Sequence, residues 1–313
     1  MSNRLVFGMD IGGTRTKYGL VDLASHQIIA HLTLPTETGG QPAFVRVAET
    51  AAVELYRQAG LRIGDISAGG ACVPGYVDGD QISMVWESLA FLEGVTLRAN
   101  MQEKLGFPIR MDNDGRTAAM GETYFGRHTP VYGVGRPRRL LSLTLGTGVG
   151  VGLVVDGQLL EKSSINHLAA HIPIRLGGGP CFCGFSGCLE SLVGGPALVR
   201  NFTRLSQAEK TDETACLDAQ AIFDLAAGDH PAAGRAVGQL IDDLIVGLNA
   251  FIFLYGPDVI VLGGGLANSL GPWLADIREG LFASPFEGYQ VKVDLSTLGE
   301  QAGLYGAASL WES

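Results

Sequence analysis

Positive charge is scarce in this sequence of 313 residues. Its 22 Lys and Arg residues are outnumbered by 32 Asp and Glu residues, so the formal net charge is −10. A surface that binds nucleic acid needs a basic face to neutralise phosphates, and this balance argues against such a surface. A single nucleotide is not excluded, because a few local donors and one magnesium ion suffice to hold it.

Uninterrupted apolar runs are short. None reaches the roughly 20 residues that a membrane-spanning helix needs, and the run near Leu141 is broken by glycines and a threonine. Residues Met1–Arg4 show no signal-peptide features and lead directly into a strand-like run, Leu5–Met9. We therefore expect a cytoplasmic protein that does not bind membranes.

Cysteine is rare and odd in number. The five residues are Cys72, Cys181, Cys183, Cys188 and Cys216. An odd total in a cytosolic chain disfavours a disulfide framework. Three of these cysteines form the spacing H-x9-C-x-C-x4-C with His171, and three thiolates with one imidazole suit a closed, structural zinc site. The alternative is a group of buried free thiols, which is what we expect of Cys72 and Cys216.

Glycine is abundant, with 45 residues, while hydrophobic residues make up 46% of the chain and charged residues 17%. This composition indicates a globular chain of about two domains. Two strand–glycine-turn–strand units occur, one joining Leu5–Met9 to Lys17–Asp22 and one joining Leu140–Leu145 to Val149–Val155. The repetition predicts a duplicated α/β domain with a cleft between the copies.

Apolar periodicity predicts the remaining elements. Further strands are expected at 28–33, 66–73, 109–111 and 259–262, and helices at about 43–59, 97–105, 115–124, 196–206, 218–227, 232–254 and 303–311.

The first glycine turn, Asp10–Lys17, has the chemistry of a phosphate loop. It lacks the GxxxxGK[ST] spacing of a Walker loop and does not open a helix, so it is not a dinucleotide fingerprint. Gly12 and Gly13 let backbone amides point at an anion, Thr14 and Thr16 can add hydroxyl donors, and Asp10 can hold magnesium. An ordinary glycine hairpin is the alternative. We assign nucleotide binding to Asp10, Gly12, Gly13, Thr14, Thr16 and Lys17.

Two further glycine segments extend this interpretation. Gly146, Thr147 and Gly148 repeat the loop chemistry in the second half of the chain, and two such loops could hold the β- and γ-phosphates of ATP from both sides. Gly263, Gly264 and Gly265 follow an apolar strand and offer a flat surface suited to a nucleoside. The cofactors expected are therefore ATP and Mg²⁺, together with structural Zn²⁺.

A polar cluster, Asp112-Asn113-Asp114, lies between a short predicted strand and a predicted helix. Taken alone, it is typical of a helix N-cap. A carboxylate at this place could also remove a proton from a hydroxyl group that receives a phosphoryl group.

These motifs resemble the ROK family of sugar kinases and repressors, within the actin/hexokinase/Hsp70 superfamily. They occur in the family's order over nearly the whole chain: the loop at Asp10, Pro74-Gly75, Asn113-Asp114, Gly146–Gly148, His171 with the cysteines, and Gly263–Gly265. The resemblance implies α/β architecture with two ribonuclease H-like, actin/hexokinase-type domains. They would span residues 1–117 and 118–299, with a C-terminal helix at about 300–313 packing back on the first.

The resemblance also implies an activity and a set of roles. The activity is ATP-dependent phosphorylation of a hexose or hexose derivative, in a homodimer. Asp114 would be the general base, while Asn113, Gly75 and Glu190 would bind the sugar. His171 would be a zinc ligand that can also meet the sugar, and zinc would order the loop that carries His171 and Glu190.

Several positions depart from the family pattern. The usual Gly-Glu-x-Gly-His segment is His167–His171 here, so Leu168 replaces a sugar-binding glutamate and Ala170 replaces a glycine. Ser88 stands where the family has a sugar-binding asparagine, and Arg116 stands where a small or amide residue is common. Each lost partner for a buried hydroxyl costs about 1–3 kcal/mol. Plain glucose is therefore expected to be a poor substrate, unless a group such as His167 compensates.

Two other functions are weighed against the kinase. One is an inactive or repurposed sugar-binding protein, which the altered pocket favours but the retained base and phosphate loops disfavour. The other is a transcriptional regulator, which would carry a helix-turn-helix before the phosphate loop. The position of Asp10 leaves no room for that motif in this sequence.

Overall fold

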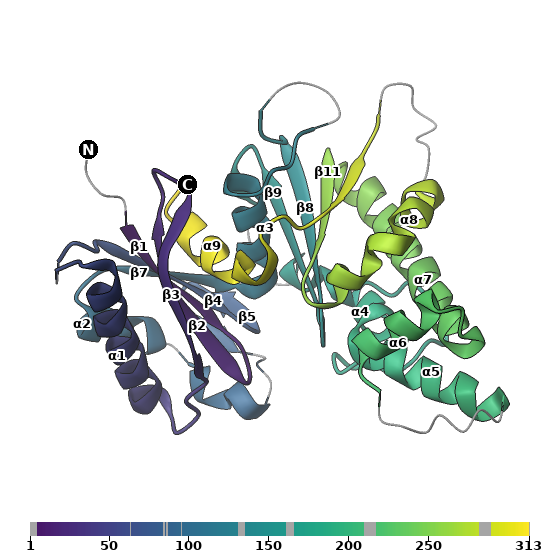
Figure 1. Cartoon of the computed structure of the whole chain (residues 1–313), viewed down its shortest axis with the longest axis horizontal. Helices are drawn as coiled ribbons and strands as arrows, with labels where there is room; N and C mark the ends of the chain where they lie inside the picture. The colour runs from purple at the N-terminus through teal and green to yellow at the C-terminus, as the bar shows by residue number, and fades with distance from the viewer. Residues whose placement is uncertain are drawn as a thin grey trace. The chain divides into compact units, whose positions relative to one another are not determined.

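The computed structural model describes residues 5–62, 64–83, 85, 87–94, 96–130, 135–160, 166–209, 217–281 and 289–312. Cys216 and the side chain of His167 lie outside this described part. Contacts group the chain into two compact units (Figure 1). The first holds Met1–Arg127, Gly152–His167 and Thr297–Ser313, and the second holds His128–Val151 and Leu168–Ser296.

The two five-stranded sheets have the same topology. The first has the order β3-β2-β1-β4-β7 and the second β10-β9-β8-β11-β12. Each begins with a meander of three strands, and each then adds two strands parallel to the first strand of that meander. The strands of the first sheet are β1 (Leu5–Ile11), β2 (Arg15–Asp22), β3 (Gln27–Pro35), β4 (Ala68–Val73) and β7 (Ile109–Asn113). Those of the second are β8 (Arg139–Leu145), β9 (Val149–Val155), β10 (Gln158–Leu159), β11 (Val259–Gly263) and β12 (Lys292–Leu295). The repetition predicted from the two glycine turns is thus present in the strand order.

Helices connect and cover these strands. They are α1 (Gln41–Ala59), α2 (Leu97–Leu105), α3 (Asp114–Tyr124), α4 (Leu189–Val193), α5 (Gly195–Glu209), α6 (Ala219–Ala227), α7 (Pro231–Tyr255), α8 (Leu274–Gly280) and α9 (Ala302–Ser309). Short 3₁₀ helices occupy Glu87–Leu92, Asn166–His171, Leu266–Trp273 and Gly299–Gln301, and β5 (Tyr76–Asp78) pairs with β6 (Gln81–Ser83).

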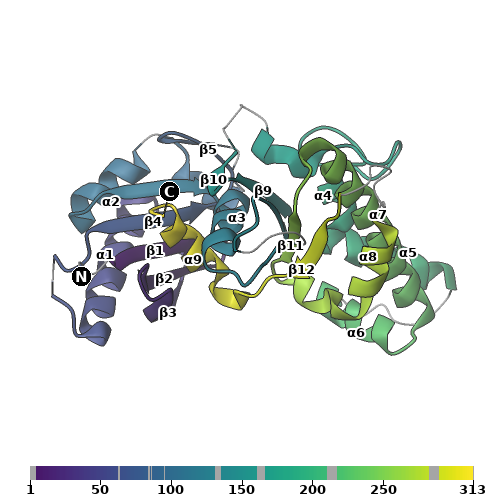
Figure 2. The same cartoon turned by 90° about the horizontal axis from the view of Figure 1, so that it is seen from above.

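The alternation of residues along β1 separates the two faces of the first sheet. Leu5, Phe7, Met9 and Ile11 point into a core closed by α1 and α2, because side chains alternate along a strand. Val6 belongs to a second cluster on the opposite face, against α9. Figures 1 and 2 show α1 and α2 on one side of this sheet and α9 on the other. Asp10, two pleats beyond Val6, therefore belongs to the α9 face.

Helix α1 shows how local sequence sets these elements. Pro42 stands in its first turn, where a missing backbone N–H costs nothing, and Gly60 ends it in the left-handed conformation at φ 66°. Its buried residues recur at helical spacing and form one apolar stripe. They are Phe44, Val45, Ala48, Ala51, Ala52, Leu55 and Tyr56.

Helix α7 is the one described helix long and apolar enough to match a membrane span, with a mean hydropathy of 1.6 over its most apolar window. Half of that window is buried inside the protein. Its buried residues include Leu240, Leu244, Leu248 and Phe251, which recur at helical spacing. This pattern is typical of a helix that packs in the core of a globular unit.

Most expected elements occur within a few residues of the predicted bounds. The structure adds elements that the apolar patterns did not reveal, including α4, α8, β12 and the short 3₁₀ helices. The domain boundaries after residues 117 and 299 stay a prediction. Contacts place the whole of α3 and the segment Gly152–His167 in the first unit, because Gly152 lies against Gly115 and Ala119 of α3.

Candidate active site

The first glycine turn is a tight hairpin between β1 and β2. Asp10 pairs with Lys17, and Ile11 pairs with Thr16, so the turn consists of Gly12-Gly13-Thr14-Arg15. The Gly12 amide donates to the Arg15 carbonyl at 3.1 Å, and a Cβ at Gly12 would lie 2.8 Å from that carbonyl oxygen. Gly13 and Thr14 are exposed. Glycine at position 12 is thus required for the shape of the turn.

Thr36 supports this turn through hydrogen bonds, and no sequence pattern predicted this role. Its hydroxyl donates to the Gly12 carbonyl at 2.6 Å and lies 3.0 Å from the Thr16 hydroxyl, while its amide donates to Thr14 at 3.0 Å. Thr16 is fully buried. Its hydroxyl takes part in this internal network, and the donor role expected of Thr16 stays a prediction.

Asp10 and Lys17 face each other across the base of the hairpin. The Lys17 Nζ lies 3.8 Å from Asp10 Oδ2 and also donates to the carbonyl of Glu300. Burial raises the pKa of Asp10, and attraction to Lys17 opposes that rise. A half-buried carboxylate with one distant cation remains short of positive partners, as a magnesium ligand should be before the ion binds.

Asp114 begins α3 at the carboxyl end of β7, as the sequence predicts. Its Oδ1 accepts hydrogen bonds from the Gly115 amide at 2.8 Å and from Asn113 Nδ2 at 2.9 Å. Water reaches the Asp114 side chain, but the dense protein around the carboxyl weakens its hydration. That desolvation raises the pKa of Asp114 to about 6; the Gly115 hydrogen bond opposes the rise and repulsion from Asp10 adds to it. The result is a carboxylate suited to proton transfer near neutral pH.

The Asn113 side chain caps α3 and also contacts Gly75 and Asp114. Its Oδ1 caps α3 by accepting from the amides of Gly115 and Arg116, at 3.0 and 3.3 Å. Its Nδ2 donates to the Gly75 carbonyl at 2.8 Å as well as to Asp114. Gly75 has φ 94°, which only glycine adopts readily. Asn113 thus ties Asp114 to Gly75, and these two bonds engage both Nδ2 hydrogens.

Arg116 is engaged by groups of its own unit. Its guanidinium is buried and pairs with Asp112 at 3.0 Å, and it donates to the Leu160 carbonyl at 3.0 Å. Asp112 also accepts from the Asn113 amide at 2.7 Å. The pair therefore supports the turn that carries Asp114.

The second glycine turn lies against α4 and α5. The Gly195 amide, at the N-terminus of α5, donates to the Gly146 carbonyl at 2.8 Å. Glu190 Oε2 accepts from the Val149 amide at 3.1 Å, and a Cβ at Gly148 would lie 2.9 Å from that same oxygen. The other carboxylate oxygen lies 3.9 Å from His171 Nδ1. Glu190 thus bridges the second phosphate turn and the cysteine cluster.

The four expected zinc ligands come together. The ligand atoms of His171, Cys181, Cys183 and Cys188 all lie within 4.8 Å of one another. Cys183 Sγ and Cys188 Sγ are 3.6 Å apart, and Cys181 Sγ lies 3.3 Å from His171 Nδ1. A zinc–sulfur bond of about 2.3 Å puts the corners of a tetrahedron about 3.8 Å apart, so this set fits zinc with small adjustments. Nδ1 lies among the thiols, which leaves Nε2 directed elsewhere.

Glycines shape the loop around this cluster. Gly184 and Gly187 have positive φ values of 93° and 74°. A Cβ at Gly187 would lie 1.8 Å from the Arg175 carbonyl oxygen. Arg175 in turn pairs with buried Asp243 of α7. The cysteine loop is therefore fixed to the helical part of its own unit.

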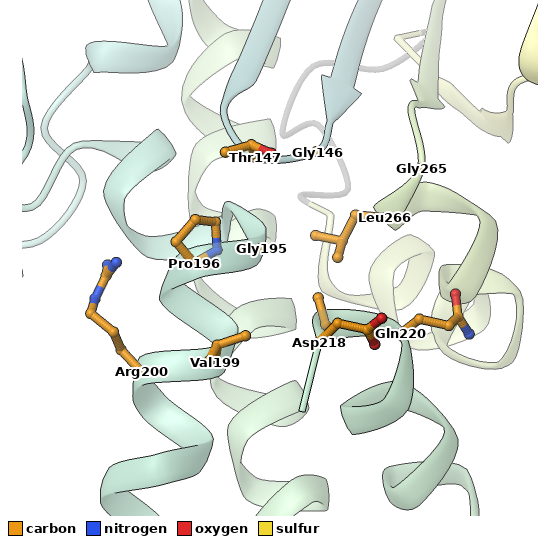
Figure 3. Close-up of a pocket in the computed structure, with 11 residues that line it drawn as sticks. Gly146, Thr147, Gly195, Pro196, Val199, Arg200, Asp218, Gln220, Gly265 and Leu266 are labelled. Carbon is orange, nitrogen blue, oxygen red and sulfur yellow. The ribbon is translucent and has the colours of Figure 1, made fainter. Parts of the chain in front are cut away.

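The second unit also holds a pocket of about 600 Å³ (Figure 3). Gly146 and Thr147 lie at one end, and Gly265 with Leu266 forms one wall. The remaining lining residues come from α5 and the start of α6 and were not anticipated. They are Gly195, Pro196, Val199, Arg200, Asp218, Ala219 and Gln220. The pair Gly194-Gly195 ahead of an apolar helix was the sequence signal that could have indicated part of this set.

The three glycines of the segment Gly263–Gly265 have different positions relative to the pocket. Gly265 lines the pocket, while Gly264 adopts φ 85° against the backbone of Leu145, where a Cβ would lie 2.4 Å from the carbonyl oxygen. Gly263 is buried as the last residue of β11. Of these three glycines, Gly265 is the one in the pocket lining.

The positions that depart from the family pattern are partly accessible. Ser88 is exposed, and its hydroxyl would lie 3.8 Å from a Cβ placed on Gly13. Leu168 is half-buried and interrupts the 3₁₀ helix Asn166–His171 with φ −90° and ψ 26°. Ala170 is buried. Ser88 thus lies beside the first phosphate turn, within the first unit.

Known proteins resemble this chain along its whole length. A glucokinase from Halalkalibacterium halodurans is 28% identical over 340 residues, covering 99% of this chain and 96% of the relative. An N-acetyl-D-glucosamine kinase from Shigella flexneri is 28% identical, covering 98% and 99%. The crystal structure of a ROK family glucokinase from Streptomyces griseus in complex with glucose and AMPPNP superposes with a TM-score of 0.78, at 26% identity and 98% coverage of both chains. The ROK family profile matches residues 6–313, and the chain therefore belongs to the ROK family.

Proposed function

We propose that this protein is an ATP-dependent sugar kinase, which transfers the γ-phosphoryl group of ATP to a hydroxyl of a hexose or hexose derivative. The observation that carries the proposal is Asp114, held by Asn113 and Gly115 at the β7–α3 junction with its pKa raised to about 6. At neutral pH this carboxylate is ionised, yet basic enough to accept the hydroxyl proton during transfer.

Magnesium would be held by Asp10, directly or through water. The fit is chemical: Asp10 is a desolvated carboxylate whose charge already repels Asp114. A divalent ion beside Asp10 would relieve that repulsion and supply the positive charge that phosphoryl transfer needs. In the first unit, the exposed backbone of Gly13 and Thr14 would contact phosphate oxygens. In the second unit, the exposed backbone of Thr147 is proposed for the same role.

The phosphoryl donor would occupy the pocket of the second unit. Its Gly146–Thr147 end adjoins the N-terminus of α5, and a helix N-terminus favours anions. Pro196, Val199 and Leu266 supply apolar surface for a base. Asp218 would accept hydrogen bonds from nucleoside groups and repel a chain of inorganic phosphates, since Arg200 is the single cationic residue in the lining. The donor is therefore ATP rather than polyphosphate.

In the first unit, the residues proposed to contact the sugar are Gly75, Ser88, Asn113 and Asp114. In the second unit, Glu190 and His171 are proposed for the same role. Leu168 cannot replace the hydrogen bonds of a glutamate side chain, so plain glucose should be a poor acceptor. The relatives named glucokinase and N-acetyl-D-glucosamine kinase make hexoses and N-acetylated hexosamines the first acceptors to test.

Zinc would be held by His171, Cys181, Cys183 and Cys188 and would act structurally. Burial, together with hydrogen bonding to Cys183, raises the pKa of Cys188 to about 12, so a cation is needed to stabilise the thiolate at neutral pH. By fixing His171 beside Glu190, the ion would order the residues that bind the sugar. The protein would work as a cytoplasmic homodimer without nucleic-acid partners.

The test is a coupled ADP-release assay over a panel of hexoses, hexosamines and N-acetylated hexosamines, with ATP and Mg²⁺. Asp114→Asn distinguishes the kinase from an inactive sugar-binding protein. A kinase loses turnover in this variant and keeps its sugar affinity, measured by calorimetry. A wild-type protein that binds a sugar of the panel but releases no ADP with any of them would refute the proposal.

A further inference from the structure

Helix α9 packs unusually close to the first sheet. A Cβ at Gly8 of β1 would lie 3.1 Å from the Leu304 carbonyl oxygen, and one at Gly70 of β4 would lie 1.9 Å from that of Ala307. The helix backbone therefore lies directly on the sheet, with no side chain between them at these points. Trp311, just after the helix, adds a hydrogen bond to the Gly69 carbonyl at 2.7 Å.

Asp10 lies on this same face of β1, beneath the first turn of α9. A Cβ added to Gly303 would lie 2.2 Å from Asp10 Cγ and 2.3 and 2.6 Å from its two carboxylate oxygens. The backbone of Gly303 does not have the positive φ that calls for glycine. Space for the Asp10 carboxylate is therefore what requires glycine at position 303.

A movement of Gly303 away from Asp10 would disturb other contacts of α9. Its carbonyl accepts a hydrogen bond from the Cys72 thiol at 2.9 Å. Cys72 is the residue of β4 that pairs with Asp10 of β1. One turn further along, Gly306 is in contact with α3, because a Cβ there would lie 2.7 Å from the Thr117 carbonyl oxygen. Helix α9 is thus held from both sides at the point where it meets Asp10.

The residue that pairs with Asp10 across the hairpin is bound to the same segment. Lys17 donates to the carbonyl of Glu300, in the 3₁₀ turn Gly299–Gln301 that leads into α9. The two ionisable residues of the first phosphate turn therefore both contact residues 300–303, which are almost at the end of the chain.

We propose that Glu300–Gly303 is a positioning clamp for the first phosphate turn, with Gly303 fixing the direction of the Asp10 carboxylate and the Glu300 carbonyl fixing Lys17. The clamp rests on the proposed function, in which Asp10 holds magnesium. Gly303 touches neither substrate nor metal; it acts through Asp10. A change in the clamp should therefore weaken binding of magnesium nucleotide and leave binding of the sugar intact.

The first test is a double-mutant cycle in stability, without ligands. Gly303→Ala, Asp10→Ala and the double variant are unfolded by heat and by urea. Gly303→Ala should lower the stability, because its methyl group displaces the carboxylate, and most of that loss should disappear in the Asp10→Ala background. If Gly303→Ala does not fold, recovery of folding in the double variant is the expected result. Additive losses, or a double variant that also fails to fold, would overturn the clamp.

The second test uses Trp311→Phe as a control on the packing of the same helix. This change removes the hydrogen bond to the Gly69 carbonyl beyond the C-terminal end of α9 and leaves the contact of Gly303 with Asp10 in place. Calorimetry should show that Gly303→Ala weakens Mg²⁺-dependent ADP binding by about tenfold or more, while sugar affinity stays within about twofold and Trp311→Phe changes neither. Equal effects of both variants on ADP binding would refute the proposal. A wild-type protein that phosphorylates no sugar would refute the kinase assignment alone, because the stability cycle and the ADP titration require no turnover.

Discussion

Asp114 should give the enzyme a pH dependence that follows from its surroundings. Desolvation raises its pKa from an ordinary value of 3.8 to about 6, and the negative charge of Asp10 adds to that rise. Only the ionised carboxylate can accept the hydroxyl proton. The value of kcat/KM should therefore be half-maximal near pH 6 and should fall with further acidification.

The expected size of the effect follows from the titration of a single group. With a pKa of about 6, about 97% of Asp114 is ionised at pH 7.5 and about 9% at pH 5, so kcat/KM should fall about tenfold between them. Asp114→Asn should lose about 10²- to 10⁴-fold in kcat, the usual contribution of a general base.

The same shift has a consequence for stability, with a definite sign. A carboxyl whose pKa is raised in the folded state destabilises that state as pH rises from about 4 to about 6, and the loss persists above that window. Asp114→Asn removes this charge while keeping an oxygen for the Gly115 amide. At pH 7.5 its Tm should therefore equal or exceed that of the wild type.

Asn113→Ala is the matched control for the pH profile. The Asn113 side chain lowers the pKa of Asp114 by donating to it, so its removal should move the half-maximal pH upward. It also removes the cap of α3, which costs about 1 kcal/mol of stability. The assay is coupled ADP release at fixed ionic strength, from pH 5 to pH 9. A flat profile below pH 7, a midpoint that moves downward in Asn113→Ala, or an active Asp114→Asn variant would refute the reasoning.

Four other outcomes are expected. Removal of zinc by chelation should lower the Tm and weaken sugar binding; sugar affinity unchanged in metal-free protein, verified by elemental analysis, would contradict the structural role of zinc. Leu168→Glu should raise kcat/KM for glucose by about tenfold, the equivalent of one recovered hydrogen bond, whereas Leu168→Met should not. Asp218→Asn should raise the rate with polyphosphate relative to ATP, as measured with both donors at equal sugar concentration. Arg175→Met leaves Asp243 buried and unpaired, and should cost about 1–3 kcal/mol by urea unfolding because Arg175 itself is partly exposed; Asp243→Asn in the same background should recover part of that loss.

Sequence patterns of short range predicted much of this protein. Alternating apolar residues and glycine turns located both hairpins, and helical periodicity located α1, α2, α3 and α7, because each of these signals lies within one element. The cysteine spacing predicted a cluster that the structure brings together, since Cys181, Cys183 and Cys188 lie in one short loop. The elements β12 and α8 were not predicted, because each is too short to show a clear apolar period.

Sequence patterns of short range could not predict contacts between segments that are distant in the chain. The sequence could not indicate that Arg116 turns back onto Asp112 and Leu160, or that Thr36 supports the first phosphate turn. Nor could it show that the pocket takes its lining from α5 and α6. These relations depend on how elements pack, and packing is set by the shapes of surfaces that meet only in the folded chain.

The glycine turn at Asp10–Lys17 shows which features are local and which depend on packing. The local pattern of residues is enough to place Asp10 beside a glycine turn between two strands, because glycine and strand alternation act locally. The direction of its carboxylate depends on tertiary packing, since Gly303, nearly three hundred residues later, lies against it. A side chain's direction depends on the space its neighbours leave, and that space exists only after distant strands and helices have packed together.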